Sequence, residues 1–135
     1  MPAIALYLST LLIYIVLDST MLSLVMHPLF QREIGDLLAA QVRLLPAALF
    51  FVGYVAGLTW LVTLPALRDG GGVISRAAVL GAMSYGTFGL SNYATLRDWT
   101  LVLVLMDIAW GALVTALAAW GGLQVARALT QEKSG

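Results

Sequence analysis

Two aspartates interrupt long apolar stretches of this 135-residue chain, and they are the side chains best suited to chemistry. Asp18 lies in the stretch 4–26 and Asp107 in the stretch 100–123. A carboxylate at the centre of a membrane helix costs about 2.5–3.5 kcal/mol, so such residues are rare and usually functional. No Lys or Arg lies within either stretch to pair with them. Carboxyls in this setting are typical of proton relays, of acid–base catalysis and of buried hydrogen-bonded pairs.

Further polar side chains recur at helical spacing and are expected to face the same carboxylates. Tyr14 precedes Asp18 by four residues, which puts both on one helix face. Tyr85 and Asn92 are two helical turns apart and also share a face. The sequence therefore predicts one polar site made of Asp18, Asp107, Asn92, Tyr85 and Tyr14.

Four apolar segments must position these residues. The chain is 61% hydrophobic and only 10% charged, a balance that a small soluble domain cannot bury. Spanning ~30 Å of hydrocarbon takes about 20 mostly apolar residues. The segments of that length are 4–26, 46–67, 77–96 and 100–123, the third being the least apolar. They predict an all-α fold with a single domain over 1–135. This domain forms an integral membrane four-helix bundle and ends in a polar tail over 124–135.

The two carboxyls are expected at the same depth in the membrane. Asp18 lies about eight residues before the end of its segment and Asp107 about seven after the start of its own, and those two ends face the same side. At ~1.5 Å rise per residue, both lie roughly 10–12 Å below that surface. The predicted site is therefore nearer one membrane face than the other.

The link over 27–45 differs from the other connections. Ile34, Leu37, Leu38 and Val42 recur at helical spacing among charged and polar residues. This pattern is typical of a short amphipathic helix lying in the membrane interface, here between the first and second spans. Trp99, in the short link before the fourth span, is typical of an aromatic belt.

Glycines mark the expected contacts between helices. Gly53 and Gly57 form a Gly-x-x-x-Gly pair in the second segment, and Gly81 and Gly111 lie on the small-residue faces of the third and fourth. Small residues let membrane helices approach closely. We expect these four glycines to serve helix packing rather than ligand binding.

Several classes of site are excluded by composition. There is no cysteine and only one histidine, which leaves no thiolate nucleophile and argues against a haem or a multi-histidine metal centre. The formal net charge is zero and no basic block exists, so nucleic acid is not an expected partner. No cofactor and no metal are expected. The first segment lacks a positive start and is longer than a signal peptide core, so we expect a retained helix.

The second half of the chain carries two motifs that resemble a known family. They are Asn92-x-Ala-Thr-Leu and Asp107-Ile-Ala-Trp110-Gly111. Together with a likeness in outline over most of the chain, they are similar to the bacterial predicted membrane proteins known as domain of unknown function 2177. The resemblance implies four membrane helices and supplies no established reaction. Where that family is expected to carry an acidic residue before the Asn motif, this chain has Gly89, and where a Trp is expected after Asp18 it has Met21.

Three functions are compatible with these features, and the sequence leaves them open. The first is a binding or accessory subunit of a larger membrane assembly, the second an enzyme acting on a lipid or apolar substrate, and the third a small proton-linked transporter acting as an oligomer. In each case Asp18 and Asp107 would be central, although two close carboxyls that do not readily both ionise also suit a purely structural role. Expected partners are membrane lipid, other membrane proteins and a second copy of the chain.

Location follows from the distribution of positive charge. Four spans put both termini on one side, with Arg68, Arg76, Arg127 and Lys133, against Arg32, Arg43 and Arg97 on the other. This small excess predicts cytoplasmic termini in a bacterial inner membrane.

Overall fold

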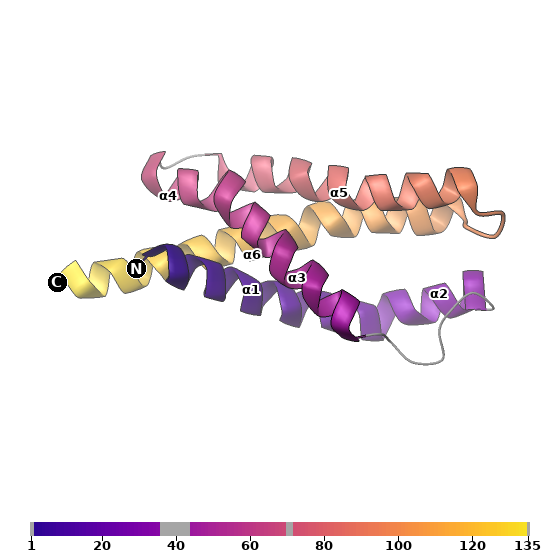
Figure 1. The fold of residues 1–135 in the computed structure, drawn as a ribbon, viewed down its shortest axis with the longest axis horizontal. Helices are drawn as coiled ribbons and strands as arrows, with labels where there is room; N and C mark the ends of the chain where they lie inside the picture. Colours follow the sequence, from indigo (N-terminus) through magenta and orange to yellow (C-terminus); the bar gives the residue numbers. More distant parts are fainter. Residues whose placement is uncertain (1, 36–43, 70–71, 135) are drawn as a thin grey trace.

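The described residues form helices joined by short connections, with no strand among them (Figure 1). A computed structural model describes residues 2–35, 44–69 and 72–134. Its elements in chain order are α1 (Pro2–Met21), η1 (Leu22–Met26), α2 (His27–Ile34), α3 (Leu44–Leu58), η3 (Thr59–Thr63), α4 (Leu64–Asp69), α5 (Val73–Thr95) and α6 (Leu101–Ser134). The chain reverses direction after α2, after α4 and after α5, and its two ends lie at the same end of the molecule (Figure 1).

Three helical stretches are long enough and apolar enough to cross a membrane. They are Ala3–Glu33, Leu45–Arg68 and Leu101–Leu129. Large apolar side chains cover their outer surfaces, among them Leu12, Leu24 and Leu49. A soluble monomer rarely exposes so much contiguous apolar surface, whereas lipid solvates it. The 23-residue helix α5 is less apolar and is not among the three, so the four-helix transmembrane bundle remains a prediction.

The first helix does not end near residue 26 as predicted but continues through η1 into α2. Pro28 lacks an N–H, and its ring would clash with the carbonyl four residues earlier in a regular helix. The π-helical turn η1 widens the helix just before it, and the His27 N–H bonds to the Leu22 carbonyl, five residues back. A second π-helical turn, η3, stands in the same relation to Pro65. Both prolines are thus accommodated inside continuous helices.

This continuation corrects the prediction for the link 27–45. Its first part, His27–Ile34, extends the first membrane helix instead of starting a separate interfacial one. Leu37, Leu38 and Val42, which carried much of the amphipathic pattern, lie outside the described residues. At the other end of the chain, α6 runs to Ser134, so the segment predicted as a polar tail is helical over its described part.

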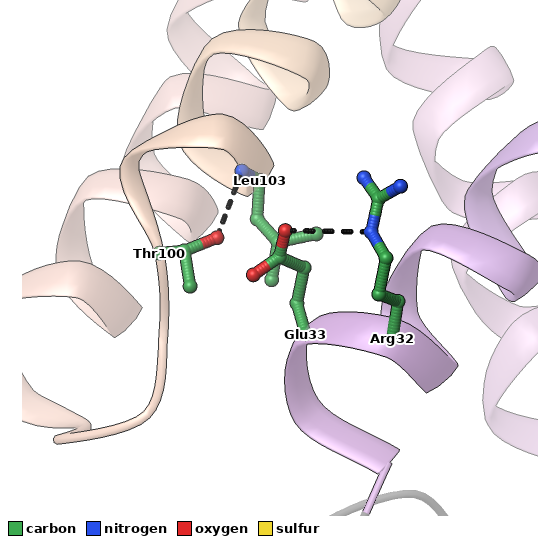
Figure 2. A network of polar contacts seen from close by, with 4 residues as sticks. All are labelled: Arg32, Glu33, Thr100 and Leu103. Carbon is green, nitrogen blue, oxygen red and sulfur yellow. Dashed lines mark hydrogen bonds and ion pairs between the residues drawn. The ribbon is translucent and has the colours of Figure 1, made fainter.

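The end of α2 lies beside the start of α6. Thr100 caps α6, its Oγ1 accepting a hydrogen bond from the Leu103 N–H at 3.4 Å (Figure 2). On α2, Arg32 and Glu33 form a loose ion pair of 3.8 Å, and Glu33 is the more buried of the two (Figure 2). Trp99 is only 8% exposed and packs with Met26, Leu29 and Leu103 in this region, so it is a core residue rather than an exposed belt anchor.

Helix α6 is the element against which α1 and α5 pack. Helix α5 lies alongside α6, and α1 covers a second side of α6. Between α1, α3 and α6, Tyr14, Val55, Val114 and Ala118 form one buried cluster. Helix α3 runs obliquely across α1 (Figure 1). The polar residues of α1, α5 and α6 are therefore turned toward one another.

Candidate functional site

Asp18 reaches across from α1 to a tryptophan of α6. The Trp110 Nε1–H donates a hydrogen bond to Asp18 Oδ1 at 2.9 Å. The same carboxylate also interacts with the hydroxyl of Tyr85 on α5. Asp18 is half-buried, so it contacts two helices and keeps part of its surface open.

Asp107 is more enclosed and less well satisfied. It is 5% exposed, and its Oδ2 has no hydrogen-bond partner among the described residues. That oxygen lies beside Gly89 of α5, where an added Cβ would be 3.5 Å away. Asp107 and Asp18 are close enough to interact electrostatically. A buried carboxyl oxygen without a partner is costly in an apolar interior, so this position calls for a functional explanation.

Tyrosines close the inner end of the site. The hydroxyls of Tyr14 and Tyr85 hydrogen-bond to each other between α1 and α5. Tyr14 is fully buried, and its ring also packs against Tyr54 at a centroid distance of 5.5 Å. Tyr54 in turn shares a 2.7 Å hydrogen bond with Thr115 of α6. The tyrosine hydroxyls thereby connect α1 with α5 and α3 with α6.

Asp18, Asp107, Tyr85 and Trp110 border a cavity of about 330 Å³. Both carboxylates line it, and most of the rest of its wall is aromatic or aliphatic. The lining residues are Asp18, Leu22, Met26, Phe30, Phe50, Ser84, Tyr85, Phe88, Asp107 and Trp110. The described wall contains no Lys, Arg or His. Phe50 of α3 and Phe88 of α5 are 46% and 53% exposed, so these two lining residues also reach the outer surface of the described structure.

The structure brings together three of the five predicted site residues in the cavity wall. Asp18, Asp107 and Tyr85 line it, whereas Tyr14 lies behind it, in hydrogen-bond contact with Tyr85. Asn92 is half-buried on α5 and is not among the lining residues.

Sequence reasoning missed Trp110 as part of the site. It follows Asp107 by three residues and so shares its helix face, which was the available signal. The aromatic wall was missed as well, because phenylalanines in a membrane helix ordinarily face lipid or the core. The aromatic residues of the cavity wall that carry no polar group are Phe30, Phe50 and Phe88.

The predicted packing glycines divide into two pairs. An added Cβ at Gly81 would lie 2.7 Å from the Gly111 carbonyl carbon, and one at Gly111 would lie 2.6 Å from Tyr85 Cδ1. These two glycines therefore permit the close approach of α5 to α6. A Cβ at Gly53 or Gly57 would meet nothing within 4 Å. The expectation that this pair packs against another helix is therefore not met within the described chain, because its face of α3 is open.

The site offers little to a metal ion. No group of three His, Asp or Glu side chains gathers anywhere in residues 2–35, 44–69 and 72–134. Two carboxylates are the only charged oxygen ligands in the described part of this mostly aromatic and aliphatic wall, so Ca²⁺ or Mg²⁺ would need water for most of its coordination shell. The cavity is mostly apolar. At one part of its wall, Asp18 and Asp107 provide either negative charge or a pair of carboxyls that share a proton.

Comparison with known proteins agrees with the motifs around Asn92 and Asp107. A family model described as "Predicted membrane protein (DUF2177)" matches residues 3–124, nearly the whole chain. No curated protein and no solved structure gives a significant match. Together with the three apolar helices, the family match establishes a membrane protein with transmembrane helices. The chain belongs to the family of predicted membrane proteins known as domain of unknown function 2177.

Proposed function

We propose that this protein is a membrane-embedded binding protein that takes a small amphiphilic molecule from the bilayer into the cavity between α1, α3, α5 and α6. The observation that carries the proposal is an apolar cavity of about 330 Å³ with two carboxylates in its wall. Ligand pockets in proteins are typically apolar, about 300–1,000 Å³ in volume, and contain a few polar groups that orient the ligand. This cavity fits the lower end of that range.

The exposed part of the cavity wall supports entry from lipid. Phe50 and Phe88 belong to it, and both are half-exposed on helices whose outer surfaces are apolar. Phe50 lies in the membrane-spanning stretch Leu45–Arg68. A ligand dissolved in the hydrocarbon region can therefore enter sideways, without crossing a polar surface.

The proposal includes α5 as a fourth membrane span, which makes the fold a four-helix transmembrane bundle in a bacterial inner membrane with cytoplasmic termini. Its support is packing: α5 runs antiparallel to the apolar α6, and Gly81 approaches the Gly111 backbone closely. The connection between the two helices, residues 96–100, is short. A helix held in this way is carried to the same depth as its neighbour.

Labelling of single cysteines tests this topology, because the chain has no cysteine of its own. Ser75 and Asp98 are exposed near opposite ends of α5. Ser75→Cys and Asp98→Cys are expected to react with a membrane-impermeant maleimide from opposite sides, Ser75→Cys from the cytoplasm. Reaction of both from one side would exclude α5 as a span.

The binding function is tested by photo-cross-linking with a neutral probe, a medium-chain alcohol that carries a diazirine. In lipid nanodiscs the probe is expected to label the cavity wall near Phe50 and Phe88. Leu22→Trp fills the cavity and should abolish this labelling, whereas Leu12→Trp, on the lipid-facing side of α1, should leave it unchanged. Labelling confined to outward-facing residues, or insensitive to Leu22→Trp, would refute a binding cavity.

A second candidate is an accessory role in a larger assembly, and the open face of α3 favours it. Val52, Gly53 and Ala56 are exposed there, and the two glycines of the Gly-x-x-x-Gly pair meet no described neighbour. Such faces commonly dock a second membrane helix. Val52→Cys is expected to form an oxidised dimer if that helix belongs to a second copy, with Leu113→Cys on α6 as the control. Equal cross-linking at both positions would mean random collision.

A further inference from the structure

The charge of the cavity wall is not balanced by any residue that the structure describes there. Asp18 receives a hydrogen bond from Trp110, a neutral donor, and Asp107 is 5% exposed with an unpartnered oxygen. No Lys, Arg or His lines the cavity among the described residues. Arg32, in the last turn of α2, and Arg97, in the connection to α6, have exposed side chains and do not line the cavity. Since no described cation compensates the two carboxylates, the cavity suits a proton or a positively charged molecule beside them.

The other lining groups suit a particular kind of compensating charge. Tyr85 and Trp110 present aromatic rings beside the two carboxylates, and Phe30, Phe50 and Phe88 continue the wall. Aromatic faces attract ammonium groups when water is excluded, Trp most strongly. A metal ion would gain nothing from such a wall, because it needs oxygen ligands. An organic cation uses the carboxylates, the rings and the apolar volume together.

We infer that the ligand of this cavity is a lipophilic amine, with its ammonium group seated between Asp18 and Asp107 and its apolar part along the aromatic wall toward Phe50 and Phe88. This inference rests on the proposed binding function and specifies its ligand class. The ammonium donates to Asp107 and to the open part of Asp18, while Trp110 keeps the Asp18 carboxylate oriented from its other side. The enclosed Asp107 supplies charge at the inner end, and half-buried Asp18 meets the ligand as it enters.

A matched pair of photoprobes tests the ligand class. A primary amine and the alcohol of identical chain length, each carrying the same diazirine, are compared on the full chain in nanodiscs of phosphatidylcholine, a zwitterionic lipid without net charge. The amine is expected to reach half-maximal labelling of the cavity wall at a concentration about tenfold lower than the alcohol, the effect of one favourable charge-assisted contact.

Isosteric variants then assign the preference to the carboxylates. Asp107→Asn and Asp18→Asn should each remove most of the tenfold preference of the cavity for the amine over the alcohol. Asp98→Asn removes a carboxylate from the exposed connection outside the cavity and should keep the preference intact. If Asp107→Asn does not fold, Asp18→Asn alone decides, because its amide oxygen can still accept the Trp110 hydrogen bond.

The possible results separate the two proposals. Equal labelling of the cavity by amine and alcohol, or a preference that survives both Asn variants, overturns the lipophilic amine but leaves a binding cavity. Absence of cavity labelling by either probe overturns the binding function itself. Amine preference that depends on both carboxylates supports both.

Discussion

The glycine contact between α5 and α6 provides a quantitative test of the packing that shapes the cavity. Gly81 faces Gly111, and an alanine methyl at Gly81 would lie 2.7 Å both from the Gly111 carbonyl carbon and from Thr115 Oγ1. Ordinary contacts of this kind begin near 3.4 Å. The Gly111 carbonyl oxygen is the nearest obstacle and lies closer still. Because it belongs to the backbone, no side-chain rotation removes it, and the two helices must separate by more than about 0.7 Å.

Two opposing effects decide the size of the change in stability. Overpacking a tight contact typically costs about 1–3 kcal/mol. Replacing a helical glycine by alanine stabilises the helix by at most about 1 kcal/mol in water, because alanine has the higher helix propensity. We therefore expect Gly81→Ala to lower the free energy of unfolding by roughly 1–2 kcal/mol. The same separation should move Tyr85, on the next turn of α5, away from the cavity.

Gly53→Ala is the matched control, because its methyl enters open space. It should leave stability unchanged or raise it by up to about 1 kcal/mol. Both variants are measured by reversible unfolding in mixed micelles with increasing mole fraction of dodecyl sulfate, followed by far-ultraviolet circular dichroism. Equal stability of Gly81→Ala and Gly53→Ala would show that α5 and α6 do not approach as closely as described, and the cavity geometry would need revision.

Two further changes probe the carboxylates. Trp110→Phe keeps an aromatic wall but removes the N–H that donates a hydrogen bond to Asp18. We therefore expect the free energy of unfolding to fall by about 1–3 kcal/mol in the same assay. An unchanged transition would mean that water or lipid headgroups satisfy the carboxylate equally well. Gly89→Ser places a hydroxyl near the unpartnered Asp107 Oδ2 and should be more stable than Gly89→Ala by about 0.5–1.5 kcal/mol. Equal stability of the serine and alanine variants would indicate that this oxygen already has a partner.

The helical nature of the chain and its membrane-spanning segments could be predicted because they depend on local composition. A stretch of about 20 apolar residues has few alternatives to a helix in lipid, where every backbone N–H and C=O needs a partner within the segment. The depth of Asp18 and Asp107 followed from counting residues along such helices, and the structure places both in one cavity wall. The motifs around Asn92 and Asp107, with the likeness in outline over most of the chain, indicated the family, which the match over residues 3–124 established.

Other features depend on how helices meet and were beyond reach of the sequence. The first helix continues past Pro28 because of the π-helical turn η1, and the presence of a proline in the sequence does not predict such a turn. Gly81 lies in a tight contact and Gly53 in open space, although both are glycines in apolar helices. Spacing along one helix cannot say which face meets a neighbour.

The sequence by itself determined that this is a helical membrane protein, because length and hydropathy are properties of single segments. From the rise per residue it also predicted that the two carboxyls lie at similar depth. Only the tertiary structure decided that Trp110 partners Asp18, that Asp107 keeps an unpartnered oxygen and that Asn92 stays out of the wall. Those outcomes depend on the rotation of each helix about its axis and on the crossing of α3 over α1. Rotation and crossing are set by packing between side chains far apart in the chain, which no local pattern records.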